Sequence, residues 1–270
     1  MVMRYFLIIV IAVGAFLSFE TASADPSAFR SHEATYLMTQ VRKYERDWSS
    51  VERAEGLLRY KFNQTCDGWT TEHQMALDIV YESGQQAQMV WHYTSWEAKD
   101  GSKLRFRTRT LTNGQETEKL NGEARKEGDQ TVVVYSQPSG KRLILPQDTF
   151  FPTRHMHESF LRAEKGEIVF NAPYFDGSSV DEGFNLDTVM TRFKGKALAK
   201  VEDQSLPKAP TWDMQLAFFK RDTNESVPHM EITARYRKDG VTTRILQDFG
   251  DFLLQGRLVD FSYVEEPNCH

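Results

Sequence analysis

The feature that most constrains this chain is an alternation of apolar and polar residues with a period of two. In Ser102–Thr112 ("SKLRFRTRTLT"), apolar or neutral residues alternate with arginines. In His229–Lys238 ("HMEITARYRK"), apolar residues alternate with charged and polar ones. Successive side chains of a β-strand point to opposite faces of a sheet, so this pattern predicts strands that bury one face.

Further segments with this alternation, or with a short apolar run, are predicted as strands: Ala34–Gln40, Leu57–Asn63, Gln88–Glu97, Thr131–Gln137, Arg142–Leu145, Glu167–Phe170, Phe184–Phe193, Met214–Arg221, Thr242–Phe249 and Leu258–Val264. Dipeptides of Asn or Asp with Gly separate many of them: Asp100-Gly101, Asn113-Gly114, Asn121-Gly122, Asp176-Gly177 and Asp239-Gly240. Such dipeptides tolerate the positive φ angles of tight hairpin turns. Strands joined by short turns predict an all-β antiparallel meander and not βαβ units.

One segment, Phe151–Gly166, departs from the alternation. Met156 and Phe160 lie on one face of a helix, and a glycine ends the segment. We therefore expect the only notable helix between about Pro152 and Lys165. The polar, proline-bearing stretch Val201–Asp213 is expected to be a long loop within one domain and not a linker between two domains.

The N-terminus has the three parts of a secretory signal peptide. A single arginine precedes an apolar run (Tyr5–Phe19), and Ala22-Ser23-Ala24 supplies a small-residue cleavage site. The run is shorter than the roughly 20 residues that a spanning helix needs, which argues against a membrane anchor. We expect cleavage between Ala24 and Asp25, which removes residues 1–24. Residues 25–270 would then form one periplasmic domain without a membrane span.

The chain contains two cysteines, Cys66 and Cys269. An even number in an exported protein favours an intramolecular disulfide, because disulfides persist in oxidising compartments. Two free thiols, or one intermolecular bond with an unpaired cysteine, are the alternatives. An intramolecular bond would close a loop of about 200 residues and remove roughly 5 kcal/mol of unfolded-state entropy in a simple chain model. It would fasten the C-terminus to the N-terminal third.

The sequence lacks the common motifs of catalysis and metal binding. No G-x-S-x-G, G-x-x-x-x-G-K-[ST] or H-E-x-x-H occurs. His155 and His157 form an H-x-H pair, but on a helix they would point about 200° apart, so we expect surface histidines and no metal site. His270 would have no thiolate partner if Cys269 is in a disulfide. We therefore expect no enzyme, no metal and no cofactor.

Charge and aromatic content point to a different kind of function. The formal net charge is −5, with both signs interspersed, and no basic run favours binding to nucleic acid. Aromatic residues make up 12% of the chain, which suits strands and apolar clefts. A sheet that curls over one face can enclose a cavity for an apolar ligand. The aromatic runs Met89–Trp96 and Ala217–Phe219 either line such a cavity or fill an ordinary core.

The stretch Gly56–Gln74, which contains "CDGWTTEHQ", resembles the EipB (cell-envelope integrity protein B) family of periplasmic proteins of α-proteobacteria. His32–Thr39 ("HEATYLMT") and the cysteine next to the C-terminus share the resemblance, which covers essentially the whole mature chain. It implies an open, barrel-like β-spiral of about 14 strands, similar in shape to the lipoprotein carriers LolA and LolB. It also implies an internal disulfide that maps onto Cys66 and Cys269, and no catalytic residues.

Three hypotheses about function follow. The first is a non-enzymatic periplasmic factor that maintains cell-envelope integrity by binding a lipid, a lipoprotein or a periplasmic protein partner. The second is a periplasmic carrier of an apolar ligand such as a lipid or lipoprotein. The third is a hydrolase whose site carries no recognised motif. A homo-oligomer is among the arrangements that the sequence leaves open.

Overall fold

The computed structural model describes residues 29–41, 50–180, 183–195, 206–221, 223, 226–250 and 252–269. The expected signal peptide and its cleavage site, Ala24 and Asp25, lie outside these residues, as do His270 and residues 201–205. The expected loop at 201–213 is too long at its end, because residues 211–213 belong to a strand. No helix in the described ranges is long and apolar enough to cross a membrane.

The described residues form a 14-stranded antiparallel sheet and one α-helix, which confirms the all-β antiparallel meander predicted from the alternation and the turns. The strands are β1 (His32–Val41), β2 (Val51–Gln64), β3 (Gly68–Tyr81), β4 (Gln86–Ala98), β5 (Lys103–Thr112), β6 (Gln115–Glu127), β7 (Gln130–Gln137), β8 (Arg142–Pro146), β9 (Val169–Tyr174), β10 (Phe184–Arg192), β11 (Thr211–Lys220), β12 (Met230–Arg237), β13 (Thr242–Asp248) and β14 (Leu253–Tyr263). The helix α1 (Pro152–Glu164) lies between β8 and β9 and confirms the helix expected near 152–165.

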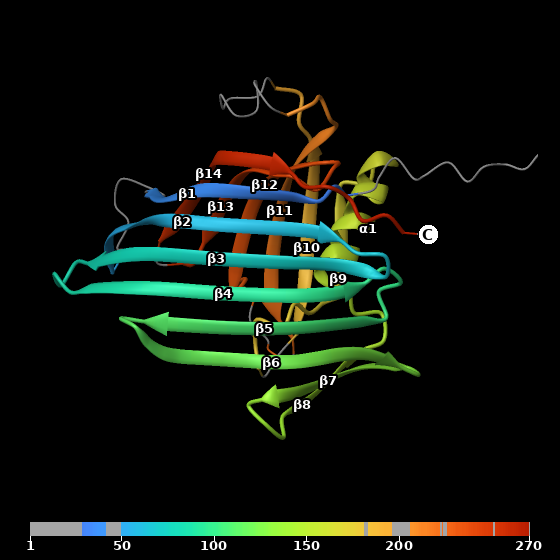
Figure 1. The fold of residues 1–270 in the computed structure, drawn as a ribbon, viewed down its shortest axis with the longest axis horizontal. Helices are drawn as coiled ribbons and strands as arrows, with labels where there is room; N and C mark the ends of the chain where they lie inside the picture. Colours follow the sequence, from blue (N-terminus) through green and yellow to red (C-terminus); the bar gives the residue numbers. More distant parts are fainter. Residues whose placement is uncertain are drawn as a thin grey trace, which may run out of the picture.

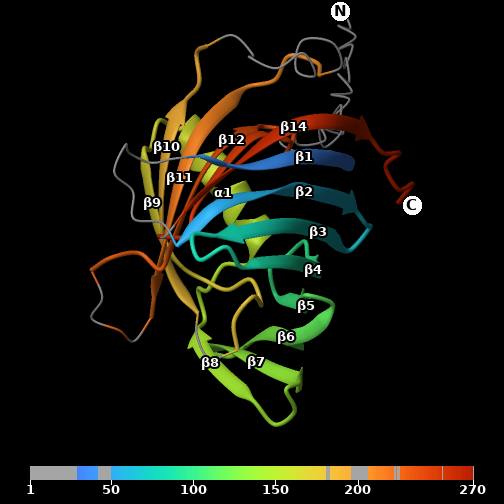
Figure 2. The same ribbon diagram turned by 90° about the vertical axis from the view of Figure 1, so that its left-hand side faces the viewer.

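The strand order explains how one meander becomes a barrel-like shell. The sheet runs β8-β7-β6-β5-β4-β3-β2-β1-β14-β13-β12-β11-β10-β9, so β1 pairs with both β2 and β14. The first and the last strand therefore meet in the middle of the sheet, and β8 and β9 are its edges. The sheet curls until it nearly closes, with α1 against one of its ends (Figures 1 and 2).

Loops fill the seam between the two edge strands. The Phe150 N–H donates to the Pro173 carbonyl over 2.8 Å, and the Phe175 N–H donates to the Phe150 carbonyl over 3.0 Å. From the other side, the Tyr135 hydroxyl donates to the Ser179 carbonyl over 2.6 Å. These bonds satisfy backbone groups that an open edge would leave unpaired.

The loop after β9 lies directly on the inner face of β5. Gly177 has a φ of +79°, and a Cβ atom there would lie 2.2 Å from Cγ of Phe106. The Tyr93 hydroxyl donates to the carbonyl of the preceding residue, Asp176, over 2.6 Å. Glycine is therefore required by both the backbone angle and the close approach.

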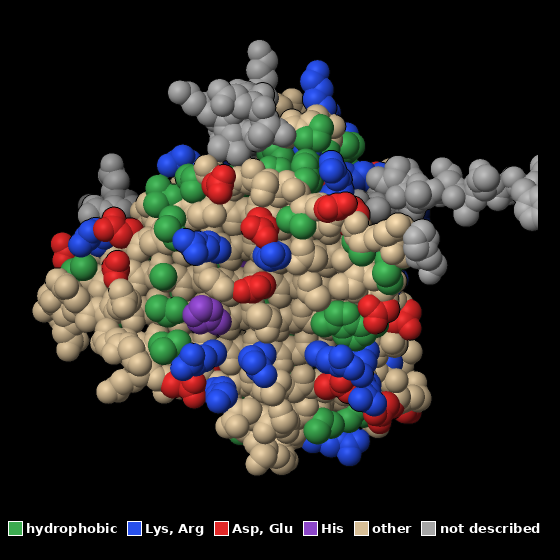
Figure 3. Space-filling view, viewed as in Figure 1, with side chains coloured by type: hydrophobic (Ala, Val, Ile, Leu, Met, Phe, Trp, Pro, Cys, Tyr) green, Lys and Arg blue, Asp and Glu red, His purple; other side chains and the backbone are tan. Residues whose placement is uncertain are grey.

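The core lies on the concave side of the sheet and consists of three clusters. The first packs α1 against β9 to β12, the second joins β1, β2, β3 and β14, and the third joins β4 to β8. Phe160 of α1 lies 5.3 Å from Trp212 and 5.9 Å from Phe29, measured between ring centroids. The outer face carries mainly polar and charged side chains (Figure 3), as the period-two pattern requires.

Two strands and one turn differ from the sequence prediction. β3 and β6 were not among the predicted strands. The inner face of β6 has only two buried apolar residues, Leu120 and Ala124, and polar Thr71 and His73 interrupt the apolar inner positions of β3. Asn121-Gly122 was predicted as a hairpin turn, and this is wrong. These residues lie inside β6 at a register shift, where Gly122 stands opposite Tyr135 and a Cβ atom would lie 2.6 Å from Cζ of Phe106.

Candidate functional site

Aromatic side chains gather on the inner face of β2, β3 and β4. Because strand register aligns them, His73 stands beside Tyr60 on one side and Tyr93 on the other. The His73 ring centroid lies 4.8 Å from Tyr60, 5.6 Å from Trp91 and 5.5 Å from Tyr93. Trp91 and Tyr93 are stacked at 5.7 Å. With Met75, which is paired with Trp91, these residues are called the inner wall.

The inner wall is only partly covered by the rest of the protein. Tyr60, His73, Met75 and Trp91 keep intermediate exposure although they face inward, whereas Tyr93 is buried. Ile232 and Tyr236 on β12, which also packs into the core, keep intermediate exposure as well. Apolar surface that folding leaves uncovered on a concave face is the kind of surface that binds an apolar ligand.

Burial keeps the inner wall uncharged. It lowers the pKa of His73 to about 4, so the imidazole is neutral at neutral pH. It also raises the pKa of the Tyr60 and Tyr93 phenols, which stay protonated. Burial raises the pKa of Tyr236 to about 12. A wall of neutral rings and a thioether favours an uncharged chain and disfavours an ion.

The aromatic run Met89–Trp96 is therefore divided between two faces. Trp91 and Tyr93 point inward, while His92 and Trp96 take the alternate, outward positions. The second run, Ala217–Phe219, contributes Phe218 to an ordinary core cluster. Of the two outcomes that the sequence left open, Phe218 takes the core position, and Trp91 lies half-buried on the concave face.

A buried carboxyl group caps α1. Glu97, at the end of β4, is 1% exposed, and its two oxygens accept hydrogen bonds from the backbone N–H groups of Thr153 and Arg154 over 2.7 and 2.8 Å. The residue at the N-cap position, Phe151, makes no side-chain cap. Burial raises the pKa of Glu97 to about 7, although the two N–H donors act in the opposite direction. Glu97 thus ties the sheet to the helix.

The expectation that His155 lies on the surface is wrong. His155 is 1% exposed and stacks on Phe170 with ring centroids 5.1 Å apart, because this face of α1 packs on β9. Burial lowers its pKa to about 3. His157 lies elsewhere, 6.1 Å from the Phe29 ring. The two imidazoles therefore contact different aromatic rings, and the described residues contain no group of three or more His, Cys, Asp or Glu side chains that could hold a metal ion.

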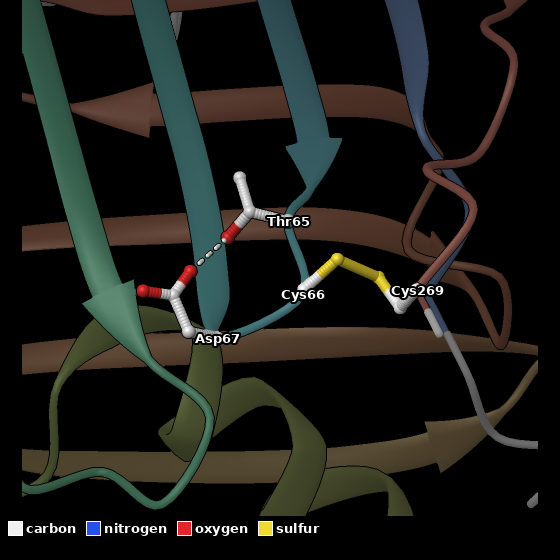
Figure 4. The surroundings of a disulfide bond; sticks show 4 residues. All are labelled: Thr65, Cys66, Asp67 and Cys269. Atoms are coloured by element: carbon white, nitrogen blue, oxygen red, sulfur yellow. Dashed lines mark hydrogen bonds between the residues drawn. A yellow bond between two sulfur atoms is a disulfide. The ribbon is translucent and has the colours of Figure 1, made fainter.

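The structure joins Cys66 to Cys269 in a disulfide, the pairing expected from the sequence. The S–S distance is 2.06 Å, the Cα atoms lie 5.5 Å apart and the two residues are 203 positions apart (Figure 4). Cys66 lies in the β2–β3 turn, where the Thr65 hydroxyl donates to Asp67 over 2.9 Å. Both cysteines are exposed, so the disulfide fastens the C-terminal tail to the rim of the shell.

The outer face has a hollow of about 580 Å³ over β5, β6 and β7. Its lining is mainly polar or charged: Arg105, Asn121, Gly122, Glu123, Arg125, Glu127, Val132, Val134, Tyr135 and Ser136. Arg105 and Arg125 both bond to Glu123, so these charges of the hollow already neutralise one another. Because the hollow is open and its charges pair with each other, we take the inner wall as the better candidate site.

Comparisons with known proteins agree with this architecture. The EipB-like family model matches residues 23–265. The cell envelope integrity protein EipB of Brucella abortus (strain 2308) is 29% identical over 270 residues, which cover 95% of this chain and 94% of that protein. A crystal structure from Brucella abortus, described as a β-barrel-like protein of a domain of unknown function, superposes with a TM-score of 0.80 at 26% identity, covering 88% of this chain and 99% of that one. The chain therefore belongs to the EipB-like family.

Proposed function

We propose that this protein is a non-enzymatic periplasmic factor that maintains the cell envelope by binding an apolar ligand, such as the acyl chain of a lipid or lipoprotein, against the inner wall. Support for the envelope role comes from the Brucella relative, which is named for cell envelope integrity. The disulfide and the signal-peptide pattern support an oxidising compartment outside the cytoplasm.

The observation that carries the ligand proposal is the uncharged, partly uncovered inner wall. Burying apolar surface contributes about 25 cal/mol per Å², so a chain that covers Met75 and Trp91 gains free energy without desolvating a charge. The neutral His73 imidazole presents ring surface to three aromatic neighbours. An ionised headgroup would have no opposite charge on this wall, so the charged end of a ligand would stay in water.

The surroundings of His73 and Glu97 support a function without catalysis. His73 contacts aromatic rings, and Glu97 uses both carboxyl oxygens to bond the backbone of α1. General acid–base catalysis needs such a group within hydrogen-bond reach of a reacting atom. Both groups are instead engaged in packing or capping.

A binding titration tests the proposal. The mature protein is titrated with a fluorescent fatty acid that brightens in apolar surroundings, and Trp91→Ala and Met75→Asn are compared with Trp96→Ala. Trp91 and Trp96 lie on the same strand but on opposite faces, so Trp96→Ala is the matched control. We expect saturable binding that the two inner variants weaken at least tenfold and the outer variant leaves unchanged. Equal binding by all four proteins, each checked for an unchanged circular dichroism spectrum, would contradict the proposal.

A transfer assay between vesicles separates a carrier from a factor that holds its ligand. A carrier should speed the transfer of a labelled acyl chain from donor to acceptor vesicles, and Trp91→Ala should slow that transfer. A factor that retains the ligand should bind it without increasing the transfer rate.

A further inference from the structure

Strand register aligns a row of apolar side chains across the outer face of five adjacent strands. Leu37 pairs with Leu57, Leu57 with Ala76, Ala76 with Val90, and Val90 with Leu111. We call these five residues the apolar row. Leu57 is 42% exposed, Ala76 is exposed, and the other three are half-buried. Figure 3 shows hydrophobic side chains forming a column down the left part of this face.

Charged residues of opposite sign flank the apolar row. The basic row lies two residues away from the apolar row along each strand, and it consists of Arg59, Gln74, His92 and Arg109. The acidic row lies two residues away from the apolar row on its opposite side, and it consists of Thr39, Glu55, Asp78 and Gln88. Single exposed apolar residues are ordinary, but a continuous row across five strands is a defined surface when two arginines flank it on one side and two carboxylates on the other.

This order of rows is self-complementary. A two-fold axis along the apolar row would place the apolar rows of two copies face to face, and the basic row of each copy over the acidic row of the other. On β2, Arg59 of one copy would face Glu55 of the other, with Leu57 on Leu57. We propose that the outer face of β1 to β5 is an interface between two copies of this chain, related by such an axis.

Charge distinguishes a second copy from an anionic membrane as the occupant. An anionic lipid surface would attract Arg59 and Arg109 but repel Glu55 and Asp78, which lie on the other side of the same row. A second copy would place Arg59 over Glu55 on β2 and Gln74 over Asp78 on β3, so neither carboxylate would meet a like charge. Glu55 is bonded to Arg53 over 2.5 Å in the single chain, with both side chains more than half exposed. Exchanging such a surface pair for another costs little.

The shape of the sheet permits a modest contact. Strands β1 to β5 are stacked with little curvature in Figure 2, and two sheet faces pack about 10 Å apart. Five strands about 4.8 Å apart span roughly 19 Å, and the outer rows lie roughly 13 Å apart. Beyond Leu37, the next strand places Arg257 in line with the apolar row. Arg257 would face Arg257 of the other copy, so the apolar contact ends at β1. We therefore expect a weak, concentration-dependent dimer at the small end of specific interfaces.

Sedimentation equilibrium over a wide range of protein concentration tests the interface. We expect a reversible monomer–dimer equilibrium in the mature protein, which Leu57→Glu weakens at least tenfold. Ile168→Glu is the matched control, because Ile168 is also an exposed aliphatic residue (61%) but lies just before β9, outside the apolar row. A protein that stays monomeric at every concentration, or a dimer that Leu57→Glu leaves intact, would overturn the proposal.

Charge reversal tests the orientation of the two copies. Glu55→Arg alone and Arg59→Glu alone should each weaken self-association several-fold, and the double variant should restore it. A mixture of the two single variants should form a mixed dimer, because one carries two basic positions and the other two acidic ones. Failure of both the double variant and the mixture to recover the dimer would overturn this geometry. Binding of monomers to phosphatidylglycerol vesicles that Arg59→Glu abolishes would instead assign the face to a membrane and overturn it as well.

Discussion

Removing the Cys66–Cys269 disulfide should lower the free energy of unfolding without changing the fold. The bond links positions 203 residues apart, and the chain-entropy relation gives an upper limit of roughly 5 kcal/mol for a loop of this size. That limit is comparable with the whole stability of a typical domain. Because both cysteines are exposed, replacing them leaves no cavity in the core, so the loss should fall mainly on the unfolded state.

The native tail has further contacts that should survive the substitution. The backbone N–H and the hydroxyl of Ser31 donate to the Glu266 carboxylate over 2.7 and 2.8 Å, and the Val264 N–H donates to the Ser31 carbonyl over 2.9 Å. Urea unfolding of Cys66→Ala/Cys269→Ala should therefore show a stability lower by about 2–5 kcal/mol with an unchanged circular dichroism spectrum. An unchanged unfolding midpoint in this variant would refute the reasoning. Two reactive thiols in the denatured, unreduced wild-type protein would refute it as well.

Three further predictions concern buried groups and one glycine. Burial raises the pKa of Glu97 from 4.5 to about 7, so the folded protein holds a proton that the unfolded chain releases between these values. The Glu97 contribution to stability should therefore fall as pH rises from 4.5 to 7, and Glu97→Gln should remove that slope in urea unfolding. Burial lowers the pKa of His73 from 6.5 to about 4, so the contribution of His73 to stability should fall as pH drops through this range. In NMR, the His73 ring signals should show no protonation above about pH 5. Gly177→Ala should destabilise the protein by roughly 2–4 kcal/mol in thermal unfolding, because the new Cβ would meet Phe106. Gly140→Ala, at a similar positive φ but with no atom within 4 Å, should cost only about 1 kcal/mol.

Local patterns in the sequence predict most of the strands, the helix and the disulfide, because alternation, periodicity and cysteine number are local or compositional signals. β3 escapes this reasoning because Thr71 and His73 occupy inward positions that apolar residues usually fill. Asn121-Gly122 looks like a hairpin turn, but close packing against Phe106 can also require a glycine within a strand.

The candidate site depends on contacts between distant segments. Glu97 and Thr153 are 56 residues apart, and no local pattern shows that Glu97 caps the helix whose first turn contains Thr153. His155 looks polar, yet its ring stacks on a strand that follows later in the chain. The apolar row emerges only once the register of five strands is known, since its members are far apart in sequence.

The most direct test of the central claim is native mass spectrometry of the mature protein, released from cells by osmotic shock without detergent. An inner wall that binds acyl chains predicts a fraction of the protein with an added mass in the range of a lipid, lost on denaturation and depleted in Trp91→Ala but not in Trp96→Ala. A protein that carries only its bare mass, and still carries none after incubation with vesicles of envelope lipids, would contradict the account.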